Sequence, residues 1–423
     1  MLFLGVPKNL LVDPPVHRAW WRSAWLLGPA LVAGVAYLDP GNVASNMTAG
    51  ARYGYLLVWV VVAGNVMAWL IQYLSAKLGI VTGQSLPEVL GTRIRNRWAR
   101  RAYWLQAELV AMATDIAEVL GGAVALNLLF GIPLLLGGAI TGAISIALLA
   151  IQTRRGPRHF EFVIIGLMSI IVVGFVAGLF VAPPDPGGVL GGMLPRFADS
   201  GSVLLAASIL GATVMPHAIY AHSALTRDRF GSDEQSRRPS IRMLLTVTRW
   251  DVTIAMVIAG SVNLAILLLA AANLAGVEGT DSLEGAHAAI TASLGPIIGT
   301  LFAIGLLASG LASTSVGAYA GAEIMHGLLT IRVPVLARRL VTLIPALIIL
   351  GIGFDPTLAL VLSQVVLSFC IPFALVPLIT LTAQRRTLGE HVNRTSTTVL
   401  GVVFAALLIA LNAVLLWLVA TGA

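Results

Sequence analysis

The chain has 423 residues, of which 58% are hydrophobic and only 11% are charged, and its mean hydropathy is +0.91. Soluble domains carry about 25% charged residues, so this composition excludes a soluble globular protein and predicts an all-α integral membrane protein. The single cysteine, Cys370, excludes an intramolecular disulfide and a cage of thiolates around a metal ion.

Eleven apolar segments are long enough to cross about 30 Å of hydrocarbon as helices. They follow a short segment at residues 1–24, and apolar residues cover each of them on all sides, as is typical of helices in lipid. In chain order we expect the spans at Trp25–Gly50, Tyr55–Val81, Trp104–Phe130, Ile132–Ile151, Phe160–Ala182, Val203–Ala224, Val252–Ala275, Pro296–Leu329, Leu336–Gly353, Thr357–Thr382 and Thr398–Val419.

The basic residues predict how these spans are oriented. If the N-terminal segment is cytoplasmic, all of the 26 lysines and arginines except Arg52 and Arg196 lie in or beside cytoplasmic segments. This bias satisfies the positive-inside rule and leaves the C-terminus outside. The net charge of +7 is therefore explained by topology, and we expect no nucleic-acid partner.

Span one is interrupted by the sequence Asp39-Pro40-Gly41-Asn42. A carboxylate at the centre of a bilayer costs about 2.5–3.5 kcal/mol, so such acids are interpreted first as functional. Proline has no N–H, and Pro40 therefore leaves the carbonyl of Ala36 without its helical partner. Because broken backbone in lipid survives only where it lines an enclosed cavity, Asp39 should face a buried polar site that suits a cation.

Span three carries three acids, Glu108, Asp115 and Glu118. Their spacings of seven and three residues place them along one helix face. A line of acids within a bilayer suggests a hydrated route or a proton relay. The alternative is a salt-bridged structural cluster, for which Arg338 and Arg339 at the beginning of span nine are available partners.

Span six repeats the anomaly of span one with Met215-Pro216-His217, where Pro216 leaves the carbonyl of Ala212 without its helical partner. Spans one and six are five apart and so run in opposite directions. This predicts the LeuT-type plan of two inverted five-helix repeats, at residues 25–182 and 203–382, with spans one and six unwound at mid-membrane. The last helix, within residues 397–423, lies outside the repeat.

The two breaks together provide a candidate cation site. Its members are the Asp39 carboxylate, the Asn42 amide oxygen, the Met215 thioether, and the carbonyls of Ala36 and Ala212. Oxygen ligands alone suit Mg²⁺ and Ca²⁺, whereas an added sulfur favours Mn²⁺, Fe²⁺ and their neighbours. The alternative is that Met215 merely fills space, as methionine usually does inside membranes.

These residues resemble the Nramp family (natural-resistance-associated macrophage proteins) of divalent-metal transporters. The likeness covers essentially the whole chain and includes the paired motifs in spans one and six, Ala113–Glu118 in span three and Gln364 in span ten. It is strongest to the bacterial proton-coupled manganese transporters. The resemblance implies a metal site formed by Asp39, Asn42, Met215 and the carbonyls of Ala36 and Ala212, with Gln364 joining in some conformations.

The resemblance also implies a route for protons to the cytoplasm. That route involves Asp39, Asp115, Glu118, Arg338 and Arg339, and the histidine in the second break, His217, suits it because imidazole titrates near physiological pH. Without the resemblance, His217 and Gln364 are equally well explained as hydrogen-bonding groups within the bundle.

The function that we expect is import of Mn²⁺, and also Fe²⁺, across the plasma (inner) membrane of a bacterium, by alternating access and coupled to protons. Metal ions and protons are then substrates, the bilayer is the only other partner, and no cofactor is needed. An amino-acid transporter on the same plan would keep the span-one break free of acid, because its substrate brings a carboxylate.

Two further alternatives require features that are not visible in the sequence. A cation channel needs a charged ring or a carbonyl filter. An intramembrane enzyme needs a catalytic motif, and neither His-Glu-x-x-His nor Gly-x-Ser-x-Gly occurs. We therefore expect a carrier and not an enzyme.

Overall fold

The computed structural model describes residues 28–155, 157–230, 240–331 and 334–421, and within these ranges the chain forms helices and no strand. The predicted segment at residues 1–24 and the first three residues of span one lie outside the described residues. The elements are α2 (Pro29–Val35), η1 (Ala36–Leu38), α3 (Pro40–Tyr53), α4 (Val58–Thr82), α5 (Leu86–Arg93), α6 (Arg97–Phe130), α7 (Leu134–Arg155), α8 (Pro157–Val181), α9 (Pro186–Gly192), α10 (Ser200–Thr213), α11 (Pro216–Phe230), α12 (Ile241–Asn273), α13 (Leu283–Leu294), α14 (Pro296–Leu329), α15 (Val335–Gly351), α16 (Pro356–Thr382), α17 (Arg385–Leu388), η2 (Gly389–His391) and α18 (Thr395–Thr421).

The helical content agrees with the predicted all-α membrane protein. Eight described helices are long and apolar enough to cross a membrane: α4, α6, the described part of α8, the joined pair α10 and α11, α12, α14, α16 and α18. Two shorter apolar helices lie at Pro29–Leu38 and Leu134–Leu148. Each predicted span overlaps one of these helices, the interrupted first segment or α15, while the count of eleven spans stays a prediction.

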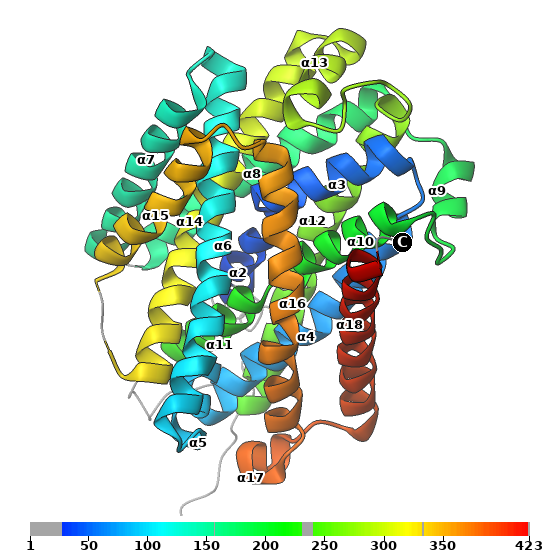
Figure 1. Cartoon of the computed structure of the whole chain (residues 1–423). Coiled ribbons are helices and arrows are strands. Elements are labelled where there is room, and N and C mark those ends of the chain that lie inside the picture. The colour runs from blue at the N-terminus through cyan, green and yellow to red at the C-terminus, as the bar shows by residue number, and fades with distance from the viewer. Residues whose placement is uncertain (1–27, 156, 231–239, 332–333, 422–423) are drawn as a thin grey trace, which may run out of the picture.

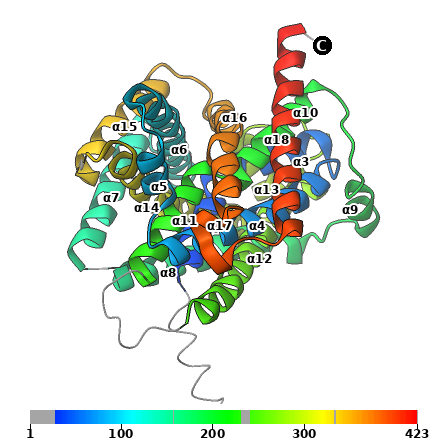
Figure 2. The same cartoon turned by 90° about the horizontal axis from the view of Figure 1, so that it is seen from below.

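The helices pack as two groups, and helix α16 contacts both of them. In the first group α12 packs on α2, α3 and α4, and α10 and α11 pack on α4. In the second group α6 packs on α7 and α14, and α15 packs on α6 and α7. Helix α16 contacts both α10 and α6, and Figures 1 and 2 show it between the two groups, with α18 beyond it at the edge.

Two helices are interrupted where the sequence places proline beside a polar or sulfur-bearing residue. Helix α2 ends at Val35, a short 3₁₀ turn follows, and Asp39 is extended (φ −70°, ψ 162°) before α3 begins at Pro40. Helix α10 ends at Thr213, and α11 begins at Pro216. In both cases proline occupies the first position of the new helix, where its missing N–H needs no partner.

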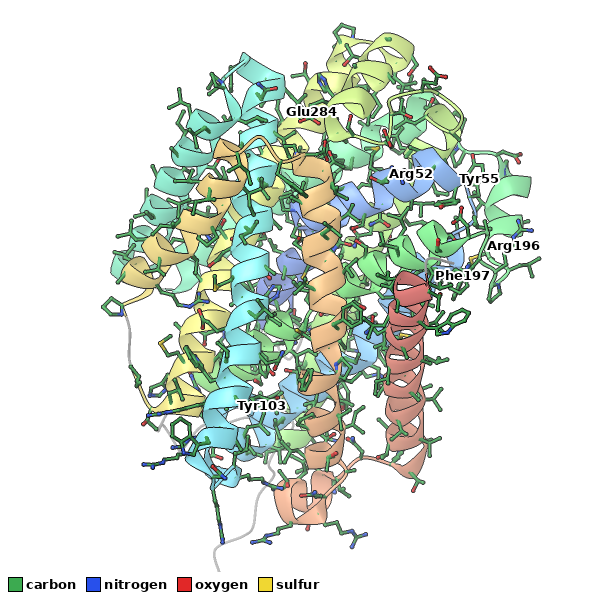
Figure 3. All side chains as sticks on the ribbon, in the orientation of Figure 1. Arg52, Tyr55, Tyr103, Arg196, Phe197 and Glu284 are labelled. Carbon is green, nitrogen blue, oxygen red and sulfur yellow. The ribbon has the colours of Figure 1, made fainter. Side chains whose placement is uncertain are left out.

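At one end of the molecule an aromatic contact joins α4 to the segment that follows α9. Figure 3 shows Arg52, Tyr55, Arg196 and Phe197 close together at this end, far from Tyr103. The rings of Trp59 and Phe197 meet edge to face with 5.5 Å between centroids. This contact holds the segment that leads into α10 against α4.

Candidate functional site

Asp39 is a fully buried carboxylate whose hydrogen-bond donors are neutral. Its Oδ1 accepts a hydrogen bond from the backbone N–H of Asn42 (2.8 Å), which caps the N-terminus of α3. Its Oδ2 accepts a hydrogen bond from Nε2 of Gln364 on α16 (2.9 Å). In the described part of the chain no lysine, arginine or histidine forms an ion pair with Asp39, so its ionised form lacks a counter-charge.

Asn42 connects the two interruptions directly. Its Nδ2 donates one hydrogen bond to the carbonyl of Tyr37 (2.8 Å) and one to the carbonyl of Ala212 (2.6 Å). Ala212 lies in the last turn of α10, and Pro216 has no N–H to offer its carbonyl. The freed carbonyl of one break is therefore in contact with the amide of the other.

The carbonyls of the first break differ from the expectation. The sequence predicts an unpartnered carbonyl at Ala36, but this oxygen accepts a 3₁₀-type hydrogen bond from the backbone N–H of Asp39 (3.3 Å). The next two carbonyls instead accept hydrogen bonds from side chains. Nδ2 of Asn263 donates to the carbonyl of Tyr37 (2.9 Å), and the hydroxyl of Ser309 donates to the carbonyl of Leu38. The 3₁₀ turn moves the unsatisfied positions one and two residues along the chain.

Gln364 lies against both interruptions. A Cβ atom added to Gly41 would lie 1.7 Å from its Nε2, and one added to Gly211 would lie 1.9 Å from its backbone oxygen. Both glycines are therefore required for α16 to approach the breaks so closely. Gln364 is itself fully buried, and its Oε1 has no hydrogen-bond partner among the described residues.

Met215 brings a sulfur atom to the second break. It lies between the end of α10 and the beginning of α11, three residues after Ala212, and is fully buried. The described residues contain no group of three or more histidine, cysteine, aspartate or glutamate side chains arranged to hold a metal ion. Any cation bound at the breaks would therefore meet one carboxylate, neutral oxygens and a thioether.

The acids of span three are paired with arginines, as the structural alternative required. Arg339 Nη1 lies 2.6 Å from Asp115 Oδ1 and 3.2 Å from Glu118 Oε2. Arg338 Nη2 lies 2.8 Å from Glu108 Oε1. We call these five residues the arginine network. It joins α6 to α15, and Arg339 within it is fully buried.

His217 lies between the breaks and the arginine network. Its Nδ1 is 3.2 Å from the hydroxyl of Thr114, the residue before Asp115 on α6. His222, five residues on, faces α4 instead, where its Nδ1 is 2.7 Å from Oε1 of Gln72. Gln72 also donates a hydrogen bond to the hydroxyl of Tyr37, so a second polar chain approaches the first break from α4.

Two sets of contacts along the first interrupted helix could not be derived from the sequence. One is the chain from Tyr37 through Gln72 to His222, which requires three helices to be placed together. The other is Asp251 on α12, whose carboxylate accepts hydrogen bonds from the backbone N–H groups of Gly28 (3.2 Å) and Ala30 (2.9 Å) and so caps α2. Asp251 directly precedes the predicted span seven, and a buried acid at such a boundary is the only signal that could have indicated it.

Comparison with known proteins identifies relatives over almost the whole chain. A family model described as natural resistance-associated macrophage protein-like (Nramp) matches residues 30–418. A curated relative from Mycobacterium tuberculosis, named divalent metal cation transporter MntH, is 60% identical over 406 residues, which cover 96% of this chain and 94% of that protein.

Solved structures show the same architecture. The manganese transporter of Eremococcus coleocola, 31% identical, has a TM-score of 0.84 over 95% of this chain and 88% of that one. Mhp1, a nucleobase-cation-symport-1 family transporter, is 16% identical and has a TM-score of 0.57 over 85% of this chain and 79% of its own. The latter likeness concerns the fold alone.

Proposed function

This chain belongs to the Nramp family, and from that premise we propose that it imports divalent transition-metal ions, Mn²⁺ and also Fe²⁺, across a bacterial plasma membrane. The curated relative from Mycobacterium tuberculosis is named as a divalent metal cation transporter, and the Eremococcus coleocola structure is that of a manganese transporter. The metal ions and protons are substrates in this proposal, and the protein needs no cofactor and performs no enzymatic reaction.

The observation that carries the proposal is the environment of Asp39. A buried ionised carboxylate without a partner is penalised by several kcal/mol, so natural proteins pair such groups or let them coordinate metals. Asp39 receives only neutral donors, and the unpaired Oε1 of Gln364 lies beside it. In this proposal the transported metal ion supplies the positive charge that Asp39 lacks.

Metal binding at this site requires Asn42 to turn. In the structure its Nδ2 donates to the carbonyls of Tyr37 and Ala212, so the amide nitrogen, which cannot bind a cation, lies beside the Ala212 carbonyl in place of Oδ1. Rotation of the amide brings Oδ1 toward the cation and releases the Ala212 carbonyl as a second ligand. A corresponding rotation of Gln364 exchanges its Nε2 for its unpaired Oε1 beside Asp39.

Met215 supplies the selectivity among divalent ions. Mg²⁺ and Ca²⁺ gain little from a thioether and lose a water oxygen to it, whereas softer first-row metals accept mixed oxygen and sulfur ligands. Burial of Met215 in the second break supports this role, because the side chain fills the space that a water ligand would need. The ligand set we propose is Asp39, Asn42, Met215, and the carbonyls of Ala36 and Ala212, with Gln364 as a conformation-dependent ligand. The Ala36 carbonyl accepts one hydrogen bond, from the N–H of Asp39 (3.3 Å), and keeps its second lone pair for the cation.

The proton route that we propose begins at Asp39 and ends in the arginine network. His217 contacts Thr114, and Asp115 and Glu118 follow on the same helix. Oδ2 of Asp115 and Oε1 of Glu118 are buried without hydrogen-bond partners among the described residues, and the nearest guanidinium to Asp115 Oδ2, that of Arg338, is 3.8 Å away, so each acid has an oxygen that can accept a proton. Arg338 and Arg339 hold the other oxygens in place.

The inward direction of transport follows, in this proposal, from alternating access across an oriented set of spans. We propose eleven spans arranged as two inverted five-helix repeats, with the breaks in the first helix of each repeat, a cytoplasmic N-terminus and an external C-terminus. The shared fold with Mhp1 and the charge bias of the loops support this arrangement. A potential of 100 mV favours inward movement of a dication by about 4.6 kcal/mol.

Ion uptake by the purified protein in proteoliposomes tests the proposal. The rates of Mn²⁺, Fe²⁺, Cd²⁺, Mg²⁺ and Ca²⁺ uptake are measured for the wild type and for Asp39→Ala. We expect saturable uptake of the first three ions by the wild type and none by the variant. The control is Glu278→Gln, which removes an exposed acid outside the helices and should leave uptake unchanged.

Two results would contradict the proposal. Normal Mn²⁺ uptake by Asp39→Ala would remove the site from the transport route. Uptake that does not saturate, and that shows the weak temperature dependence of a pore, would replace the carrier with a channel.

A further inference from the structure

A groove separate from the two breaks lies between α4 and α12. Its volume is about 580 Å³, within the range of about 300–1,000 Å³ that small-molecule sites occupy. The aromatic side chains of Trp69 and Tyr73 on α4 form one wall, and Leu245, Arg249 and Trp250 on α12 form the other. None of these residues contributes to the proposed metal site or to the arginine network.

Arg249 is held over this groove by aromatic contacts. Its guanidinium lies 5.8 Å from the centre of the Trp69 ring. That ring is itself fixed, because its Nε1 donates a hydrogen bond to the hydroxyl of Thr253 (2.9 Å) and it stacks on Tyr73 with 6.5 Å between centroids. A cation over an aromatic face is attracted by the ring, so Arg249 is oriented without an acid.

Arg249 also lacks an acidic partner within the described residues, where the ion pairs of other arginines have been identified. The guanidinium carries five N–H donors in a planar fork that matches phosphate oxygens. Its partner is therefore expected from outside the chain, and the chemistry of that partner is a phosphate or a similar anion.

The surface that continues from the groove is apolar and exposed. Trp250, Ile254 and Val257 are 64%, 41% and 58% exposed and follow one another at intervals of four and three residues, which places them on one face of α12. A soluble phosphate would leave this stripe without a role. A phospholipid would place its acyl chain along it.

The position of the groove along α12 indicates which leaflet of the bilayer it faces. Helix α12 begins at Ile241, and the span that the sequence predicts within it begins at Val252, so Arg249 lies at the membrane boundary. The positive-inside bias assigns this boundary to the cytoplasmic side. Anionic lipids attract basic residues on that side, and basic pockets between helices bind their head groups.

We propose that this groove binds an anionic phospholipid of the cytoplasmic leaflet, with its phosphate on Arg249 and an acyl chain along Trp250, Ile254 and Val257. The opposite side of the same turn of α12 carries Asp251, which caps α2. The lipid therefore sits on the outer face of the turn that holds the first half of span one.

Native mass spectrometry of the detergent-purified full chain, titrated with phosphatidylglycerol, tests this proposal. We expect Arg249→Gln to weaken binding of the first lipid about tenfold, as loss of a charge-assisted hydrogen-bonding group does. The matched control is Arg242→Gln, two turns earlier on α12 and exposed, which should bind the lipid as the wild type does. Phosphatidylcholine, which has no net charge, should bind weakly to all three proteins.

Two further arms keep the test decisive. Trp250→Ala leaves Arg249 in place and alters an exposed residue, so the protein should fold and still bind phosphatidylglycerol more weakly than the wild type. Glycerol phosphate tests for a soluble anion and should not displace the lipid. Equal lipid affinity of the wild type, Arg249→Gln and Trp250→Ala would overturn the proposal, as would displacement by glycerol phosphate at equal concentration.

Discussion

Two regions of this protein bury carboxylates inside the helix bundle and treat their charge in opposite ways. In the arginine network, Asp115 and Glu118 both pair with the guanidinium of Arg339. Arg338 forms an ion pair with Glu108. At the first break, Asp39 is just as buried but accepts hydrogen bonds only from an amide side chain and a backbone N–H within the described residues.

The difference separates acids whose charge is balanced by arginines of the protein from an acid that is available to bind a metal ion. A buried ion pair supplies its own counter-charge and so has no need of a metal ion. A buried carboxylate with only neutral donors is stable when it is protonated or when a cation occupies the site. The sequence places all of these acids in apolar helices, and only their neighbours tell the two kinds apart.

The largest expected effect is the loss of stability when the arginine network is disrupted. Arg339→Gln should lower the free energy of unfolding by about 3–5 kcal/mol, because it leaves Glu118 buried without a counter-charge and leaves Asp115 with Arg338 alone, whose Nη1 lies 3.8 Å away. Asp39→Asn should leave stability unchanged or raise it, since it removes a charge that has no partner. Thermal unfolding in detergent compares both with Arg386→Gln, an exposed arginine on α17; similar midpoints for all three variants would contradict the distinction.

A second prediction concerns the ligands around Asp39. Met215→Ala should reduce the discrimination between Mn²⁺ and Ca²⁺ by about tenfold, because an oxygen of water then replaces the thioether. The expected change is faster Ca²⁺ uptake with Mn²⁺ uptake largely kept, measured by competition in proteoliposomes. Met256→Ala alters another buried methionine, on α12, and should keep the discrimination. Unchanged discrimination in Met215→Ala would leave the sulfur as packing only.

A third prediction separates protons from metal. Replacement of both Asp115 and Glu118 by their amides removes the titratable groups from the proposed proton route but leaves Asp39 and its neighbours in place. We expect proton influx that accompanies Mn²⁺ to fall severalfold more than Mn²⁺ uptake, as followed with a pH-sensitive dye inside the vesicles. Equal losses of both fluxes would assign these acids a structural role alone.

The smallest expected effect lies outside the membrane. Glu88 on α5 pairs with Arg227 on α11 at 2.8 Å. Burial alone would raise the pKa of Glu88, but its hydrogen bonds with Arg227 and Ser85 bring the pKa below the ordinary value. Glu88→Gln should therefore lower stability by about 1 kcal/mol at neutral pH.

The pH dependence of that effect follows from the direction of the pKa shift. The contribution of Glu88 is complete above its unfolded-state pKa of about 4.3 and disappears as the pH falls through its lowered folded-state pKa. The wild type and Glu88→Gln should then converge in thermal stability in acid. A difference that does not shrink as the pH is lowered would exclude the ion pair as its cause.

Much of this fold could be predicted from the sequence because its causes are local. The apolar lengths give helices at the predicted spans, and Pro40 and Pro216 begin new helices after both predicted interruptions. Pairing of Arg338 and Arg339 with the span-three acids could be anticipated because few buried partners were available.

The remaining contacts depend on how distant helices meet. The carbonyls of Tyr37 and Leu38, and not that of Ala36, receive side-chain donors, because Asn263 and Ser309 come from α12 and α14. Capping of α2 by Asp251 joins residues more than two hundred positions apart. A periodicity or a motif within one segment cannot predict such contacts, because each of them joins two segments that are far apart in the sequence.

Isothermal titration of Mn²⁺ into the purified protein tests most directly whether the missing counter-charge of Asp39 is the metal ion. The wild type and Asp115→Asn should both bind Mn²⁺ at one site, and Asp39→Asn should bind it about 100-fold more weakly, since the only anionic ligand is lost. If Asp39→Asn binds Mn²⁺ as the wild type does, while Asp115→Asn does not, the cation site lies in the arginine network and the present assignment is wrong.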